Sequence, residues 1–156
     1  MKYTRLTKEQ LEELHQEFIN FLATQSITAD EWATLKTEKP AVAEQEIDVF
    51  SDLVWEGVLK QANYLENVSP QHMYLFHLGE NEMKLIAIKI LQEGIDITTK
   101  EGFNWLRDNY ATEKVEILTA NKAYSEDRNA DKFALVQQGS NITKGQLFQW
   151  FESITA

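Results

Sequence analysis

The chain has no cysteine, which excludes disulfide bonds, thiolate catalysis and every zinc or iron–sulfur site built on cysteine. Glycine is scarce as well, with six residues in 156, and the glycine-rich patterns that cradle phosphates do not occur. No serine lies in the Gly-x-Ser-x-Gly pattern of a nucleophile turn. We therefore expect no cofactor and assign no catalytic residue.

Positive charge is also in short supply, because 15 basic residues face 25 acidic ones and the net charge is −10. Nucleic-acid binding and docking on anionic lipid both need a basic surface, so neither partner is expected. Apolar runs are far shorter than the roughly 20 residues that span a bilayer. The first residues, MKYTRLTKEQLEELHQEF, lack the apolar core of a secretory signal. These features favour a cytoplasmic protein, and the acidity permits a basic protein partner.

Four capping boxes mark helix starts, each with threonine followed three residues later by Glu or Gln. They begin at Thr7, Thr28, Thr98 and Thr143. Helical apolar spacing follows each one. The predicted helices are 8–24, 29–37, 40–62, 99–109 and 144–153.

Segments rich in aromatic and β-branched residues predict strands. The predicted strands are 64–68, 71–78, 83–90, 115–119 and 132–137, with a polar loop at 124–131. The segment Gly139 to Gly145 is interpreted as a turn that leads into the last helix. We expect an α+β fold in one domain, 1–156, with helices packed on an antiparallel or mixed sheet. Residues 1–62 form its helical part, and 63–156 form a strand-rich part with two helices.

An acidic row recurs along the helix predicted at 40–62. We call it the acidic row, and its members are Glu44, Asp48, Asp52 and Glu56. Four-residue steps drift by about 40° on an α-helix, so the carboxylates form a slanted line and not a convergent cage. The helix predicted at 40–62 contains no histidine, so it lacks the Glu-x-x-His motif of carboxylate-bridged metal sites. A solvated helix face is the simplest interpretation, a protein-docking surface is the second, and a metal or catalytic site is the third.

Other candidate site residues are few. His72 and His77 lie five apart in a predicted strand, so they should point to opposite faces and cannot form a simple ligand pair. His15 lies among glutamates on a helix, and we expect no metal site. Trp32 lies on a short, otherwise polar helix, so it is a candidate exposed aromatic for a protein interface.

Three segments carry a family resemblance. They are MKYTRLTKEQLEELHQEFINFLATQSITADEWATLK, EIDVFSDLVWEGVL and NITKGQLFQWFE. They resemble a family of short uncharacterised proteins from flavobacteria and their relatives, along nearly the whole chain. The resemblance implies a bacterial cytosolic protein. It transfers no catalytic or binding residue.

The favoured hypothesis is a non-enzymatic protein-binding or regulatory module that uses the acidic row and Trp32. A first alternative is a small enzyme with a site between helices and sheet, built from His72 or His77, Tyr74 and a carboxylate of the helix 40–62. A second alternative is an acidic inhibitor that mimics nucleic acid. The identity of the partner and the oligomeric state do not follow from the sequence.

Overall fold

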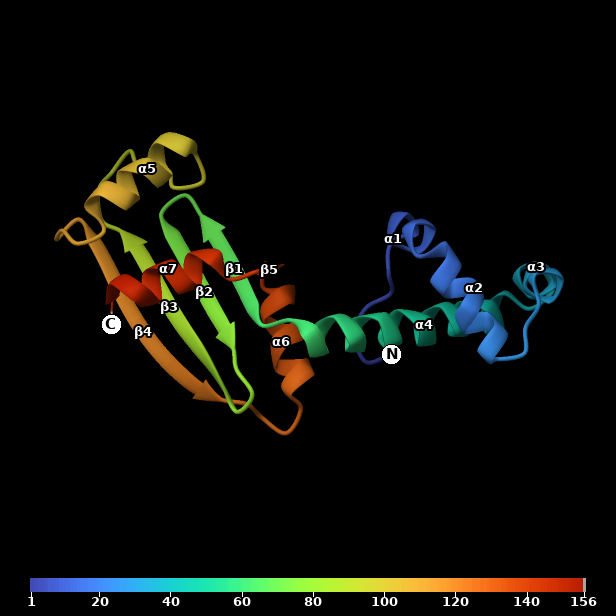
Figure 1. Cartoon of the computed structure of the whole chain (residues 1–156). Coiled ribbons are helices and arrows are strands. Elements are labelled where there is room, and N and C mark those ends of the chain that lie inside the picture. Colours follow the sequence, from blue (N-terminus) through green and yellow to red (C-terminus); the bar gives the residue numbers. More distant parts are fainter. Residues whose placement is uncertain (156) are drawn as a thin grey trace. The chain divides into compact units, whose positions relative to one another are not determined.

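The structure is a computed structural model that describes residues 1–155, and it has the predicted α+β fold. Seven helices and one five-stranded antiparallel sheet account for its regular elements within those residues (Figure 1). The chain divides into two compact units, Met1–Lys60 and Gln61–Ala156. The division falls two residues before the predicted change from a helical to a strand-rich part. Whether the units act as one domain stays a prediction.

Unit 1 consists of four helices. They are α1 (Lys8–Glu13), α2 (His15–Thr24), α3 (Ala29–Glu38) and α4 (Pro40–Gln61), which ends one residue into the second unit. Thr7 forms a complete capping box with Gln10 at the start of α1, and Thr28 accepts a hydrogen bond from Glu31 N–H at the start of α3. These two threonine caps confirm the predicted helix starts, because the threonine oxygen satisfies an N–H that has no partner inside the helix.

The single helix predicted at 8–24 is wrong in one respect, since the structure has a break at Leu14. The backbone there has φ −99° and ψ 24°, outside the α-helical region. Main-chain hydrogen bonds continue on both sides, from Leu14 N–H to Gln10 C=O and from Phe18 N–H to Leu14 C=O. The segment contains neither glycine nor proline, so no residue type marks the break in the sequence.

The core of unit 1 is an aromatic cluster. Its buried members are Leu6, Phe21, Leu22 and Phe50, and Phe18 packs beside them. The ring of Phe18 lies 5.0 Å from that of Phe50, and Phe21 lies 5.5 Å from the same ring. The cluster therefore ties α2 to the middle of α4 through tilted ring contacts, a favourable geometry for aromatic pairs.

Unit 2 is built on an antiparallel sheet with the strand order β4-β3-β2-β1-β5. The strands are β1 (Tyr64–Ser69), β2 (His72–Leu78), β3 (Glu82–Ile90), β4 (Val115–Ala123) and β5 (Asn141–Thr143). The predicted hairpin of β2 and β3 is confirmed, with Leu78 paired to Met83 next to the turn. The strand predicted at 115–119 continues to Ala123, and β5 was not predicted.

Helices cover the two faces of this sheet unequally. On one face, α5 (Lys100–Asn109) and α7 (Gln146–Thr155) cover the buried side chains of β2 and β3 (Figure 1). Leu106 and Phe151 are fully buried there. On the other face, α6 (Arg128–Gln137) contributes Leu135 and Val136 to a smaller cluster of buried residues. That smaller cluster contains Ala62, Leu65, Leu78 and Met83.

The strand predicted at 132–137 is wrong, and the loop predicted at 124–131 ends at Asp127, because residues 128–137 form helix α6. Its N-cap is Asp127, whose side chain accepts a hydrogen bond from Ala130 N–H. A short apolar run such as Phe133 to Val136 fits a strand or a buried helix equally well. The cap was the missed signal, because it contains aspartate without the Glu or Gln of a capping box.

A buried lysine fastens α6. Lys132 is 3% exposed and donates a hydrogen bond from Nζ to the carbonyl of Ala62, at 2.8 Å. Burial lowers the pKa of Lys132, because it disfavours the charged form.

The two later helix starts are shifted from their predictions. Thr99, and not Thr98, caps α5 by accepting a hydrogen bond from Gly102 N–H. Thr143 lies in β5 and accepts from Gly145 N–H, and α7 begins at Gln146. Between them, Gly145 has φ +80°, and a Cβ at this position would fall 2.3 Å from the ring of Tyr64.

Among residues 1–155, no helix combines the length and apolar character that crossing a membrane requires.

Candidate functional site

The acidic row on α4 is held by the N-terminal segment of the same chain. The Asp52 carboxylate accepts hydrogen bonds from the main-chain N–H groups of Lys2 and Tyr3, at 2.8 and 2.9 Å. The Lys2 ammonium contacts Glu56 at 2.7 Å, and the Arg5 guanidinium contacts Asp48 at 2.6 Å. Three of the four predicted carboxylates therefore have partners within unit 1.

Two further side chains of α4 complete this contact, and neither was predicted. Ser51 is fully buried, and its Oγ accepts a hydrogen bond from Leu6 N–H at 3.1 Å. The indole N–H of Trp55 donates to the carbonyl of Thr4 at 3.1 Å. Main-chain groups of residues 2–6 are thus bonded to side chains of α4 at four points.

Charge pairing has the expected effect on the row. The Arg5 guanidinium lowers the pKa of Asp48 through its hydrogen bond, because it favours the charged carboxylate. Glu44, the fourth member, is exposed at the start of the row. The structure gives the acidic row a role in the fold of unit 1. Docking of another protein on the acidic row stays a prediction, and so does the inhibitor alternative. Unpaired carboxylates would have supported both, but three of the four carboxylates are paired within unit 1.

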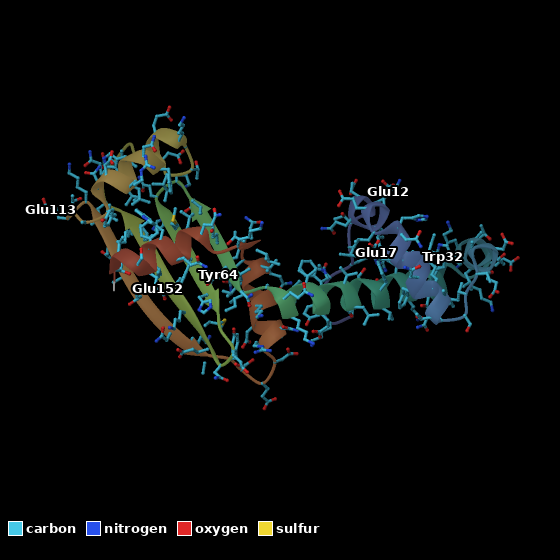
Figure 2. All side chains as sticks on the ribbon, in the orientation of Figure 1. Glu12, Glu17, Trp32, Tyr64, Glu113 and Glu152 are labelled. Carbon is cyan, nitrogen blue, oxygen red and sulfur yellow. The ribbon has the colours of Figure 1, made fainter. Side chains whose placement is uncertain are left out.

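Trp32 is half-buried and packs on unit 1 rather than standing clear of it. Its ring meets that of Phe18 edge-on, with 5.2 Å between centroids. Figure 2 shows Trp32 beside α2, which carries Phe18. The aromatic cluster accounts for this tryptophan, and its predicted role in partner binding stays untested.

The two strand histidines lie on opposite faces of the sheet, as their spacing predicted. His77 stacks on Tyr64 at 4.9 Å and lies 5.6 Å from Phe148 of α7, on the helix-covered face. Figure 2 shows Tyr64 next to α7. His72 stacks on Tyr74 at 6.2 Å, on the other face. No cluster of three or more His, Asp or Glu side chains within residues 1–155 could hold a metal ion. The alternative enzyme site stays a prediction.

The sheet face opposite α5 and α7 is only partly covered, and it is the strongest candidate surface. We call it the open face and define it by side chains of β2, β3 and β4 that share one side of the sheet. They are Tyr74, Phe76, Leu85, Ala87, Leu118 and Ala120. Leu118 is 59% exposed and Tyr74 is 37% exposed, so large side chains of two strands are exposed on the same side of the sheet.

Two hollows lie along the open face. The first has a volume of about 320 Å³ and is bordered by apolar residues of β2, β3, β4 and α6, among them Phe76, Leu85, Ala120 and Leu135. The second, about 250 Å³, is lined by apolar and charged residues of β2, β3 and β4, among them His72, Tyr74, Ala87, Lys89, Glu116 and Leu118. Both hollows extend over three strands and are partly open, and this suits broad apolar contact better than capture of one small molecule.

Sequence reasoning could have found part of this face. The alternation in β2 and β3 was visible, but both faces of these strands carry apolar or aromatic residues. The positions of α5, α6 and α7 decide which face stays open, and α6 was predicted as a strand. The missed signal lies in β4, where the pattern Leu118, Ala120, Lys122 continues on one side past the predicted end.

The comparisons with known proteins identify the family. A model of the family of unknown function DUF6495 matches residues 1–156, so the chain belongs to this family. No curated protein and no solved structure matches the chain.

Proposed function

We propose that this protein is a protein-binding module without catalytic chemistry, and that the open face of unit 2 is its binding surface. One observation carries the proposal: large apolar side chains of β2 and β4 stay exposed beside hollows lined by apolar residues. Exposed apolar surface of this kind, rimmed by charged residues, is typical of protein interfaces. The partner contributes apolar side chains that enter the hollows.

The chemistry of the open face supports binding rather than catalysis. Titratable groups, among them His72, Lys89 and Glu116, line the hollows together with apolar side chains. His72 stacks on Tyr74, and no carboxylate is paired with it by a hydrogen bond within residues 1–155. General acid–base catalysis needs a base that a neighbouring group orients. A cytoplasmic location and an origin in flavobacteria or their relatives belong to the same proposal and rest on the sequence.

Site-specific photo-crosslinking tests the proposal in the full-length chain. A benzophenone amino acid replaces Tyr74 on the open face, and a matched chain carries it at Val49, which is 50% exposed on α4. Both chains are irradiated in lysate of the source cells, and adducts are identified by mass spectrometry. We expect the chain labelled at position 74 to capture a distinct protein that the chain labelled at 49 does not capture.

A second variant guards against nonspecific capture. Leu85→Asp places a charge in the first hollow, next to position 74, and should abolish the adduct while circular dichroism shows an unchanged fold. The proposal is wrong if position 74 yields no adduct, if positions 49 and 74 yield the same adducts, or if the adduct survives Leu85→Asp. An adduct between two copies of this chain at position 74 also contradicts it, because the open face would then serve self-association.

A further inference from the structure

Strand β4 is an unprotected sheet edge. It pairs with β3 on one side and is the last strand in the order, as the orange strand in Figure 1 shows. It is nine residues long, against about 5–6 for an average strand, and every residue from Leu118 to Ala123 is exposed. The register to β3 runs without interruption, and the strand contains no proline. Proteins usually block such edges with proline, bulges, charged side chains or a covering element, and of these β4 has only the charges of Glu116 and Lys122.

The pairing of β3 with β4 shows which residues of β4 have main-chain groups that face away from the sheet. Leu91 N–H donates to Lys114 C=O, and Ile90 N–H donates to Gln71 C=O on the opposite side of β3. Bonded and non-bonded pairs alternate in an antiparallel ladder. The even-numbered residues of β4 therefore direct their main-chain groups to β3. The odd-numbered residues Ile117, Thr119 and Asn121 present theirs to the free side.

The sequence of β4 is complementary to itself when two copies run antiparallel about Thr119. The nine residues then overlap fully, with Val115 opposite Ala123. Glu116 of each copy falls opposite Lys122 of the other, which gives two pairs of opposite charge. The main-chain groups of the odd-numbered residues meet in bonded pairs, as the ladder requires. Opposite charges directly across an antiparallel pair stabilise it.

Side chains on the open face fit the same register. Leu118 of each copy lies opposite Ala120 of the other, and Ala120 borders the first hollow. The large exposed side chain thus meets a small one beside a space that can receive it. A two-fold axis at Leu118 would instead oppose Lys114 to Lys122, two like charges. An axis at Ala120 would oppose Leu118 to Lys122, so the axis at Thr119 is the best match.

We propose that β4 is the interface for a second copy of this chain, which extends the sheet through an antiparallel β4–β4 pair with its two-fold axis at Thr119. The interface is isologous, so the contact closes at two copies. This inference goes beyond the proposed function and does not rest on it. Tyr74 lies two strands away from the β4 edge, so crosslinking at position 74 and pairing through β4 can fail independently.

Single cysteines test the register directly, because the chain has none of its own. In the proposed pair the two Thr119 Cα atoms lie about 5.5 Å apart, within the roughly 4.4–6.8 Å that a disulfide spans. The two Asn121 positions are separated by four residues along the strand, roughly 14 Å. Under mild oxidation, full-length Thr119→Cys should form a disulfide-linked dimer, and the matched control Asn121→Cys should stay monomeric on a non-reducing gel.

Charge exchange provides a second test that leaves the main chain untouched. Glu116→Lys places like charges opposite each other at two sites, and we expect roughly tenfold weaker dimerisation by sedimentation equilibrium. The double variant Glu116→Lys/Lys122→Glu restores opposite charges and should restore dimerisation. Both positions are exposed, so the fold should not change by circular dichroism.

Three results overturn the inference. The first is a wild-type chain that sediments as an 18.1 kDa monomer at every concentration. The second is equal crosslinking of the cysteines at positions 119 and 121. The third is a double charge variant that dimerises no better than Glu116→Lys alone.

Discussion

The two units differ in which of their surfaces is covered by the chain itself. In unit 1, residues 2–6 contact the acidic row of α4, and Arg5 and Lys2 form ion pairs with its carboxylates. In unit 2, the sheet leaves one long edge and part of one face without cover. The feature that looked most like a binding surface in the sequence is engaged by its own chain. The surface that stays open consists of ordinary strand residues.

The comparison teaches that a charge pattern does not by itself mark a surface for partners. A row of carboxylates at four-residue spacing costs free energy through like-charge repulsion unless cations lie nearby. Residues 2–6 remove that cost and gain four main-chain hydrogen bonds. Apolar strand residues give no such signal, because exposed and buried faces of a strand can have the same composition.

A large-to-small substitution in the core of each unit has the largest expected effect on the free energy of unfolding. It tests whether the two units unfold independently. Phe151→Ala removes a fully buried ring of unit 2 and should lower its free energy of unfolding by about 3–5 kcal/mol. Amide exchange should show lost protection in β2 and β3 while α4 keeps its protection. The control, Phe50→Ala in unit 1, should give the reverse pattern. Equal loss in both units for either variant would show one cooperative domain.

Loss of the buried hydroxyl on α4 tests how firmly the N-terminal segment is held. Ser51→Ala leaves the Leu6 N–H without its acceptor in a buried position. We expect unit 1 to lose about 1–3 kcal/mol, measured by urea unfolding. Ser153→Ala, at an exposed serine of α7, should change stability by less than about 0.5 kcal/mol. Equal, small effects of both variants would contradict a structural role for residues 2–6.

Acid titration addresses the charges of the row. The pKa of Asp48 is lowered in the folded chain by the hydrogen bond from Arg5, so the unfolded chain takes up this proton first as the pH falls. The stabilisation is present at neutral pH and is lost as the pH falls below about 4. Asp48→Asn should therefore flatten the pH dependence of unit 1 stability below pH 4. An unchanged pH profile would show that Asp48 and Arg5 are not coupled.

The smallest effect is expected at the first carboxylate of the row. Glu44 is exposed, and no hydrogen bond or ion pair joins it to the rest of residues 1–155. Glu44→Gln should change the free energy of unfolding by less than about 0.5 kcal/mol. Asp52→Asn should cost more, because Asp52 accepts two main-chain hydrogen bonds. Thermal unfolding of the two variants measures the difference. Equal effects would contradict a stabilising role for the hydrogen bonds of Asp52 to the N-terminal segment.

Much of the fold followed from the sequence because local signals agreed with it. The capping threonines at 7 and 28 placed two helix starts, and the alternating segments around residues 79–82 placed the central hairpin. The failures have physical causes. An aspartate cap hid α6, and the short strand β5 has too few residues for a pattern.

The candidate site was less predictable than the fold. The acidic row was visible, but its partners Lys2 and Arg5 lie more than 40 residues away in the sequence. Contacts of that separation depend on the path of the chain and leave no periodic signal. The open face was equally hidden, because it is set by what α6 leaves uncovered.

Amide hydrogen exchange of the full-length chain, measured at low and at high protein concentration, is the most direct test of the contrast between the covered acidic row and the uncovered edge of β4. We predict that the amides of Tyr3 and Leu6 are protected at both concentrations. The amides of Ile117, Thr119 and Asn121 should exchange freely when dilute and become protected when concentrated, while those of Leu118 and Ala120 stay protected throughout. Free exchange at Tyr3 and Leu6, or protection at 117, 119 and 121 that does not change with concentration, would contradict the account.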